Sequence, residues 1–583
     1  MKKVLSIILS IILSISCIGC FSSSNHIHIY DNSSTSPSVL NKCIFNNCNV
    51  GKMPAKNNYY DELIESEFDN KLLETMDGLY NNLIESINMI SNISQEEFEL
   101  YKDNIKENFK QFEKNYKILI AYYQYSKIKY DIKANKDNSN NYDKFSEMYN
   151  KYKIYYYELI YLISKTSLKD YVLNYSEETY KLVEKEYLAG LNEELQTLIK
   201  QNLQLKFEAR KIDSLDTSNK VPTLYKQIVD NNNKQAKIYN YDSYIEYAFE
   251  SIYNRNYDYK ESLEYCEKVK KYIVPLYTKI KQEYNILLEK KNFSKKENEY
   301  FKAITTASFF TNTIANQLVN DYMKQMNNND TMLFDIVFED LFSNGNYFLG
   351  EYNGAYEWNV NNFGKPILYF GPNHYQSPFT IIHEFGHYME DYTYNNSYIS
   401  NELLETHSQG NELMFLAYLK NKIKTNVFNI IETGKILETL EIIIRSAVVN
   451  IFEIATYKHI YNGSDEEKYL LDMEITPNEY DELFQSILKD YGLDNSNLES
   501  YWRYLVDFKH VYFISYSMSA LTSLQIYAYS KEIGFEESKD KYFKLFTYND
   551  VNEKFTYEEV LEYSGLYNYD DDSLFEFINK LYS

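Results

Sequence analysis

The sequence predicts an all-α protein. Its 583 residues include only 16 glycines and 8 prolines, which is few helix-breaking residues for a chain of this length. Most of the chain consists of long stretches rich in Glu, Lys, Leu, Ile and Tyr, with apolar residues three and four positions apart. The formal net charge of −24 argues against nucleic-acid binding, which requires a basic face.

The first 20 residues have the pattern of a secretory signal. Two lysines precede an apolar stretch from Val4 to Ile15, which is shorter than the ~20 residues of a membrane-spanning helix. The stretch leads to Cys17 and Cys20 and resembles a bacterial lipoprotein signal, in which a cysteine becomes lipid-modified. We expect the lipid on Cys20, with Cys17 as the alternative; a plain cleaved signal or a retained anchor is the other interpretation. This pattern predicts an extracytoplasmic lipoprotein, on the cell surface or the periplasmic side of a membrane.

Residues 21–56 are rich in Ser and Asn and have no hydrophobic period, which predicts a flexible tether. Cys43 and Cys48 lie within it and could pair in an oxidising compartment, but their spacing does not decide whether they do. Cys266 falls in a helical pattern, and we expect it to be a buried thiol.

A helical lobe is predicted over residues 57–240. One of its helices opens with a capping-box signature, in which Ser94 is followed three residues later by Glu97. A soft boundary is expected within residues 210–240, where "DSLDTSNKVP" and "DNNNKQAKIYNYDSY" interrupt the helical pattern. Residues 241–583 would then form the second lobe.

The segment 343–378 differs from its surroundings because it concentrates Gly, Asn, Pro and aromatic residues. Its "KPILYF" stretch predicts a short strand. This least helical part of the chain directly precedes the main chemical motif.

That motif is "TIIHEFGHYMEDY", residues 380–392. The preceding Ser-Pro pair predicts a helix that begins at Pro378. His383 and His387 are four residues apart and share one helix face, so both imidazoles can bind one metal ion. Glu384 lies about 100° further around the helix, where it can take a proton from the attacking water and pass it to a leaving amine. Gly386 is unfavourable in a helix interior and indicates close approach by another element.

A catalytic zinc site needs a third protein ligand. The next predicted helix, "SNELLETHSQGNELMFLAYLKNKI", offers four candidates: Glu402, Glu405, His407 and Glu412. Glu405, Ser408 and Glu412 share one face of this helix. We expect Glu405 to be the ligand and Glu412 to orient a histidine ring, with Ser408 beside them.

The stretches "FTIIHEFGHYME" and "LLETHSQGNEL" together resemble the thimet oligopeptidase and oligoendopeptidase F family of zinc metallopeptidases. In that family, one glutamate of the second helix is the third ligand, and a further glutamate follows seven residues later, as Glu405 and Glu412 do here. Softer similarities occur in "GAYEW", "YDSYIEYAFESIYNRNYDY" and "YFISYSMSALTSLQIYAY". The resemblance covers residues 240–583 well. It implies a two-lobed, helical zincin-type fold with a deep central channel and a small β element next to the active-site helix.

The resemblance also implies roles near the carboxyl end. Tyr512 and Tyr516 look like the hydroxyl groups that hydrogen-bond the oxyanion of the tetrahedral intermediate. The family's histidine upstream of this motif is absent at the usual spacing, and His510 is the nearest candidate to share its work. Glu390 stands where many relatives have histidine, so this chain is a divergent member.

The sequence therefore predicts an endopeptidase that hydrolyses short peptides with one zinc ion per chain. We expect a monomer that contacts the membrane through its lipid anchor. Two alternatives remain: a degenerate, peptide-binding surface lipoprotein, and a zinc peptidase of another family with a different third ligand.

Overall fold

The computed structural model describes most of the chain beyond residue 70. The described ranges are 71–90, 95–173, 175, 177–209, 212, 220–327, 334–343, 345–358, 366–393, 400–458, 479–493, 498, 501–547 and 555–582. The predicted signal, the tether with its cysteine residues, and the predicted helix cap at Ser94 all lie outside them.

The chain forms two compact units. One contains the described residues of Cys20–Glu193 and Ile336–Pro372, and the other those of Glu194–Asp335 and Asn373–Ser583. Their secondary structure is almost entirely helical, with one small sheet, which confirms the predicted fold class. A channel between lobes stays a prediction.

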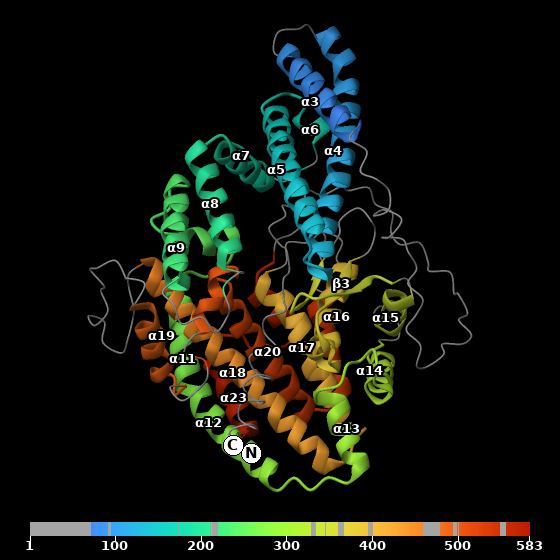
Figure 1. Cartoon of the computed structure of the whole chain (residues 1–583), viewed down its shortest axis with the longest axis vertical. Coiled ribbons are helices and arrows are strands. Elements are labelled where there is room, and N and C mark those ends of the chain that lie inside the picture. The colour runs from blue at the N-terminus through green and yellow to red at the C-terminus, as the bar shows by residue number, and fades with distance from the viewer. Residues whose placement is uncertain are drawn as a thin grey trace. The chain divides into compact units, whose positions relative to one another are not determined.

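The first unit is a helical hairpin assembly (Figure 1). Its helices are α3 (Lys71–Ile90), α4 (Gln95–Ile132), α5 (Lys136–Ser164), α6 (Lys169–Val172), α7 (Glu177–Gly190) and most of α15 (Phe334–Ser343). Asn135 begins α5, because its side chain accepts a hydrogen bond from the Asn138 amide at 2.8 Å. The core between these helices is rich in buried tyrosine. Part of the chain's abundant tyrosine therefore serves packing in this unit.

The sheet of the first unit has three short strands: β1 (Tyr347–Leu349), β2 (Ala355–Trp358) and β3 (Ile367–Phe370). The central strand is β3, with β1 parallel and β2 antiparallel to it. The strand predicted from "KPILYF" is confirmed as β3. Asp131 at the end of α4 accepts hydrogen bonds from Tyr356 at its carboxylate and from Tyr369 at its backbone oxygen, at 2.8 and 2.9 Å. These bonds attach the sheet to α4.

The second unit contains the remaining elements. Before the sheet these are α8 (Glu193–Ala209), α9 (Lys220–Ile238), α10 (Tyr244–Tyr247), η1 (Ala248–Ile252), α11 (Tyr259–Lys268), η2 (Val269–Ile273), α12 (Val274–Glu289), α13 (Lys295–Thr305) and α14 (Thr313–Gln325). After it come η3 (Asn373–Gln376), α16 (Pro378–Thr393), α17 (Asn401–Leu419), α18 (Thr425–Lys458), α19 (Glu479–Asp490), η4 (Tyr501–Val506), α20 (Phe513–Glu532), α21 (Phe535–Thr547), α22 (Tyr557–Tyr563) and α23 (Asp572–Tyr582).

Helix α18 runs through the core of this unit and packs against α20, which in turn packs against α17; α16 also packs against α17 (Figure 1). Most residues of α17, α18 and α20 are buried on every face. A helix buried all round is expected at the centre of a large core. The buried Cys266 thiol of α11 packs against α18, and this prediction is confirmed.

The contacts divide the chain at residue 193, whereas the sequence predicted a boundary near residue 240. The physical reason lies in an aromatic cluster. Tyr225 of α9 contacts the rings of Phe452, Tyr480 and Trp502, so the apolar face of α9 is buried against α18, α19 and η4. Helix α9 therefore belongs to the second unit, and the boundary predicted within residues 210–240 stays a prediction.

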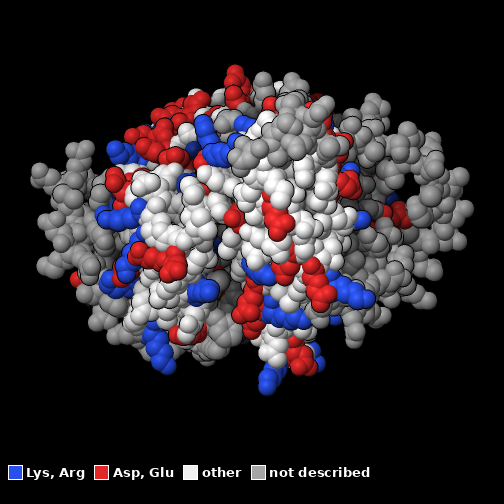
Figure 2. Space-filling view, turned by 90° about the horizontal axis from the view of Figure 1, so that it is seen from above, with Lys and Arg blue, Asp and Glu red and all other residues white. Residues whose placement is uncertain are grey.

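The described helices include none that is long and apolar enough to cross a lipid bilayer. On the face in Figure 2, acidic and basic side chains both form small groups among neutral residues. This surface shows no continuous basic stripe across its described residues, in keeping with the strongly negative net charge.

Candidate functional site

The motif helix begins as predicted. α16 starts at Pro378, and the Ser377 hydroxyl accepts a hydrogen bond from the Thr380 amide at 3.3 Å. With this start, His383 and His387 lie on one face, and their ring centroids are 5.2 Å apart. Local backbone geometry therefore brings two imidazoles together before any tertiary contact forms.

The third member of the group comes from α17. One ligating atom each from His383, His387 and Glu405 lie within 4.8 Å of one another, and all three residues are buried. His387 Nε2 is 3.7 Å from Glu405 Oε2. The structure thus brings the predicted ligand set together.

Gly386 makes this arrangement possible. A Cβ atom added there would lie 2.6 Å from Ser408 Cα and 2.7 Å from the His407 carbonyl oxygen. The backbone of α17 occupies the space that any side chain at residue 386 would need. The predicted close approach is confirmed, and it sets the separation between the histidines and Glu405.

Two other candidates on α17 have different partners. The Glu402 carboxylate accepts hydrogen bonds from Tyr257 at 2.7 Å and from Arg255 Nε at 3.2 Å. His407 Nε2 bonds the Leu545 carbonyl at 3.2 Å, and its ring stacks on Phe546. Both groups are buried and bonded to other residues, so neither completes the group of His383 and His387.

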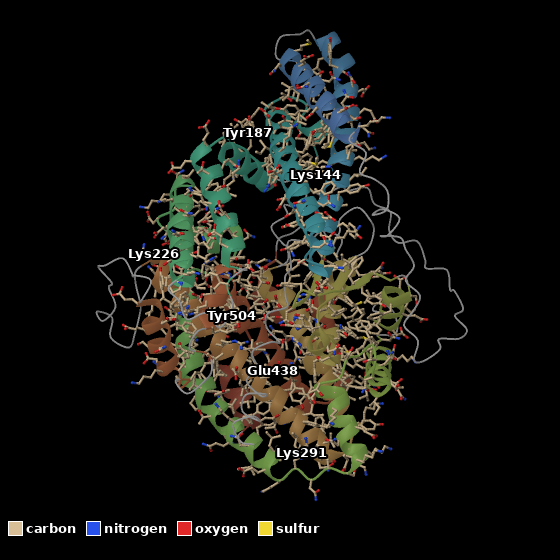
Figure 3. All side chains as sticks on the ribbon, viewed as in Figure 1. Lys144, Tyr187, Lys226, Lys291, Glu438 and Tyr504 are labelled. Carbon is tan, nitrogen blue, oxygen red and sulfur yellow. The ribbon has the colours of Figure 1, made fainter. Side chains whose placement is uncertain are left out.

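Glu412 contacts the outer nitrogen of a candidate ligand. Its Oε1 lies 2.7 Å from His383 Nδ1, which leaves Nε2 of that ring as the nitrogen available to a metal. Lys435 of α18 donates to Glu412 Oε2 and also to Glu438, which Figure 3 labels on α18. A buried chain of alternating charges therefore extends from His383 to α18.

These neighbours shift the pKa values of His383 and Glu412. Burial by itself lowers the pKa of His383, but the hydrogen bond and negative charge of Glu412 outweigh it and raise the pKa to about 9. Burial raises the pKa of Glu412, but the charges of Lys435 and His383 outweigh it, so the net shift is downward. Glu412 is therefore an ionised carboxylate at neutral pH.

The residues fit a zinc ion. His387 Nε2 is a buried nitrogen with no hydrogen-bond partner among the described residues, and it lies toward the Glu405 carboxylate. Burial, followed by the positive charge of His383, lowers the pKa of His387 well below its usual value, so its ring is neutral. Two imidazole nitrogens and one carboxylate oxygen are the donor set that many catalytic zinc sites use. A buried nitrogen without a hydrogen-bond partner is rare, and a bound metal ion would supply the missing partner of His387 Nε2.

Glu384 follows His383 directly on α16 and is 1% exposed. Its negative charge is one of the causes that raise the pKa of His383. This is the position that the sequence predicted for a general base.

Of the residues predicted near the carboxyl end, Tyr512 contacts the candidate metal ligands and His510 is bonded within the core. Tyr512, directly before α20, donates a hydrogen bond to Glu405 Oε1 at 2.8 Å, so its hydroxyl faces the ligand carboxylate. The Tyr516 ring lies next to it, with centroids 5.2 Å apart. His510 instead bonds the Tyr457 hydroxyl through Nδ1 at 2.9 Å and stacks near Tyr225. Burial lowers the pKa of His510 well below its usual value.

The remaining polar residues named from the sequence are also buried. Ser408 donates to the Glu405 backbone oxygen at 3.0 Å, which keeps its hydroxyl beside the site. Glu390 is 5% exposed, and burial, followed by the charge of Asp391, raises its pKa well above the usual value. Both causes favour the protonated form of the Glu390 carboxyl group.

Lys435 and Glu453, two buried ionisable residues of α18, were not predicted as part of the site. The stretch "IIETGKILETLEIIIRSAVVNIFEIA" carries both within an apolar context. A charge inside such a stretch requires a buried partner, and this signal marks residues that support a site.

No family model and no curated protein matches this sequence. Solved structures match it in fold. PZ peptidase A with inhibitor 2 aligns with a TM-score of 0.62 at 14% identity, over 89% of this chain and 98% of that chain. A protein provisionally named oligoendopeptidase F, from Bacillus anthracis str. Ames, aligns with a TM-score of 0.60 at 13% identity, over 89% and 96% of the two chains. The M32 carboxypeptidase from Deinococcus radiodurans R1 gives a TM-score of 0.50 at 10% identity, over 80% and 98%. At these identities the likeness establishes the helical fold of these peptidase structures.

Proposed function

We propose that this chain, which has the fold of the oligoendopeptidase F structures, is a zinc-dependent endopeptidase that hydrolyses short peptides. The observation that carries the proposal is the buried group of His383, His387 and Glu405, with Glu384 beside it. The fold by itself would not support an activity, because one fold hosts many functions. The ligand set and the adjacent carboxylate supply the chemistry.

His383, His387 and Glu405 would hold the zinc ion, which when bound polarises a carbonyl group and lowers the pKa of water. Glu384 takes the proton of the attacking water and delivers it to the leaving amine. Glu412 fixes the ring of His383 through Nδ1. We propose Tyr516 as the donor to the substrate oxyanion, because the family resemblance implies that role and its ring lies next to that of Tyr512, with centroids 5.2 Å apart.

We also propose that the protein is an extracytoplasmic lipoprotein anchored through Cys20, with Cys17 as the alternative. The support is the signal pattern of the first 20 residues. Metabolic labelling with a fatty-acid analogue tests it: Cys20→Ser should abolish labelling, while Cys17→Ser should keep it. The reverse result would move the anchor to Cys17, and labelling of neither form would reject the anchor.

One alternative has a specific observation in its favour. The family's upstream histidine is absent at the usual spacing, and the nearby His510 is bonded to Tyr457 in the core. The loss of a catalytic histidine is expected in a degenerate protein that binds peptides without cleaving them. Zinc stoichiometry and cleavage of a quenched peptide library separate the two functions. Zinc bound without cleavage at any peptide length would favour the binding protein.

The direct test of the mechanism is Glu384→Gln. This variant should keep one zinc per chain and lose nearly all peptidase activity, because the amide cannot accept a proton. The matched control is Glu390→Gln on the same helix, which should keep activity because Glu390 lies outside the group of His383, His387 and Glu405. Full activity in Glu384→Gln would reject the mechanism.

A further inference from the structure

A strained residue precedes Tyr512. Val511 has a φ of 62°, in the left-handed region that a β-branched side chain rarely adopts. Such a conformation costs free energy and persists only where the surrounding structure holds it. The turn lies directly before the tyrosine that donates to Glu405.

Two side chains hold the peptide group that precedes Val511. The Val511 amide donates to Glu453 Oε1 at 2.8 Å, and Glu453 is fully buried on α18. The carbonyl of His510 accepts a hydrogen bond from the Tyr253 hydroxyl at 2.7 Å. The single peptide group between His510 and Val511 is therefore bound at its N–H and at its carbonyl by side chains from two different parts of the unit.

The turn determines where the Tyr512 hydroxyl lies. The left-handed residue directs the chain into α20, which begins at Phe513, so Tyr512 is placed between two fixed points. Its hydroxyl reaches Glu405 Oε1, while the other carboxylate oxygen of Glu405 faces His387. One oxygen is thus oriented by Tyr512 and the other is directed at the candidate metal position.

We propose that Glu453 is a positioning residue for the metal site. By holding the strained Val511 turn, it fixes the Tyr512 hydroxyl on Glu405 and so presents that carboxylate to the metal. The proposal rests on the proposed role of Glu405 as a zinc ligand. It assigns Tyr512 to the ligand shell, in place of the oxyanion role expected from the sequence.

Zinc affinity measured by chelator competition tests this, with thermal melting as a check of folding. Tyr512→Phe should bind zinc about 10–100-fold more weakly, the usual effect of losing a group that orients a ligand. Glu453→Leu should weaken binding in the same direction, because the turn loses its acceptor. Glu453→Gln keeps an oxygen acceptor at the same place and should stay within about threefold of wild type.

The double variant distinguishes positioning from a general structural role. If Glu453 acts through Tyr512, Tyr512→Phe combined with Glu453→Leu should bind zinc no more weakly than Tyr512→Phe alone. Effects that add in the double variant would overturn the proposal, because Glu453 would then act by another route. If Glu453→Leu does not fold, Glu453→Asp, which retracts the acceptor by one methylene, should show the same loss and the same lack of additivity; wild-type affinity in Glu453→Asp would overturn the proposal.

Two controls separate this inference from the proposed function. Tyr516→Phe should keep wild-type zinc affinity, because Tyr512 is the residue that donates to Glu405. If Glu405→Ala loses zinc while Tyr512→Phe keeps wild-type affinity, the positioning role fails and the zinc site stands. If wild type binds no zinc, or Glu405→Ala binds it unchanged, both fail.

Discussion

At the scale of single residues, three glutamates of α17 differ only in their partners. Glu402 is paired with Arg255, Glu405 faces His387 and Tyr512, and Glu412 lies between a histidine and a lysine. A buried carboxylate is costly unless a cation, metal or hydrogen-bond donors compensate its charge. Each glutamate therefore acquires its role from the side chain that another element presents to it.

The bond between Glu412 and His383 predicts an effect on metal affinity. Glu412→Ala should weaken zinc binding about 10–100-fold, because His383 loses the partner that fixes its ring. Chelator competition measures the effect. The control is Glu438→Ala, since Glu438 accepts a hydrogen bond from the same lysine, Lys435, and lies outside the three-residue metal group. Equal losses in both variants would mean that Lys435, not the histidine contact, carries the effect.

The close approach at Gly386 predicts a loss of stability. Gly386→Ala should lower the free energy of unfolding by roughly 1–3 kcal/mol, because its Cβ would overlap the backbone of α17. Gly78→Ala in α3 is the matched control, since no described atom lies within 4 Å of its added Cβ. That control should stabilise the protein by roughly 0.5–1 kcal/mol through helix propensity. Urea denaturation of both variants measures the difference; a Gly386→Ala variant as stable as wild type would show that α17 can move away.

At the scale of elements, α17, α18 and α20 carry polar groups inside the core. Ser517 of α20 donates to the Ile443 carbonyl of α18 at 2.8 Å, and Ser515 donates to Glu402 of α17 at 2.8 Å. These bonds join neighbouring helices at defined positions, so their relative register is specified more narrowly than apolar packing alone would require. The metal group depends on that register because its residues come from two helices.

The buried ion pair between Glu402 and Arg255 gives a prediction about how strongly such buried polar contacts stabilise the protein. Glu402→Ala should destabilise the protein by about 3–5 kcal/mol, because Arg255 would remain as an uncompensated buried charge. The control is Asp230→Ala, which breaks the solvent-facing pair with Lys226 and should cost less than about 1 kcal/mol. Thermal or urea unfolding measures both. Similar small losses would show that Arg255 reaches water in the variant.

At the scale of the whole molecule, stability should depend on pH through Glu453. Burial raises the pKa of Glu453 to about 8, while its bond from the Val511 amide acts in the opposite direction. The folded protein therefore binds this proton more tightly than the unfolded chain. The stabilisation is fully present below the ordinary carboxyl pKa and is lost as the pH rises through about 8.

The corresponding prediction is a change in the pH profile of unfolding. Between pH 5 and pH 9, Glu453→Gln should lose less stability than the wild type, because its amide stays neutral and keeps an acceptor for the Val511 amide. The difference between the two proteins should grow with pH. Melting temperatures across this range, with zinc saturating in both proteins, measure it; parallel profiles would show that Glu453 does not titrate there.

The sequence by itself determined the local features of the site. Helix periodicity places His383 and His387 on one face, the Ser-Pro pair sets the start of α16, and the apolar run at 367–370 forms a strand. Gly386 indicated that the backbone of another element lies close to this helix. These features depend on residues within a few positions of one another, so backbone geometry is enough to predict them.

Only the tertiary structure decided which group completes the site and what supports it. Four residues of α17 were candidates for the third ligand, and the choice depends on partners far away in the chain, such as Arg255 for Glu402. Tyr512 donates to a carboxylate 107 residues before it, and Glu453 holds a turn 58 residues after it. Burial makes each such partner energetically necessary, but no local pattern in a single sequence says which distant side chain will meet it.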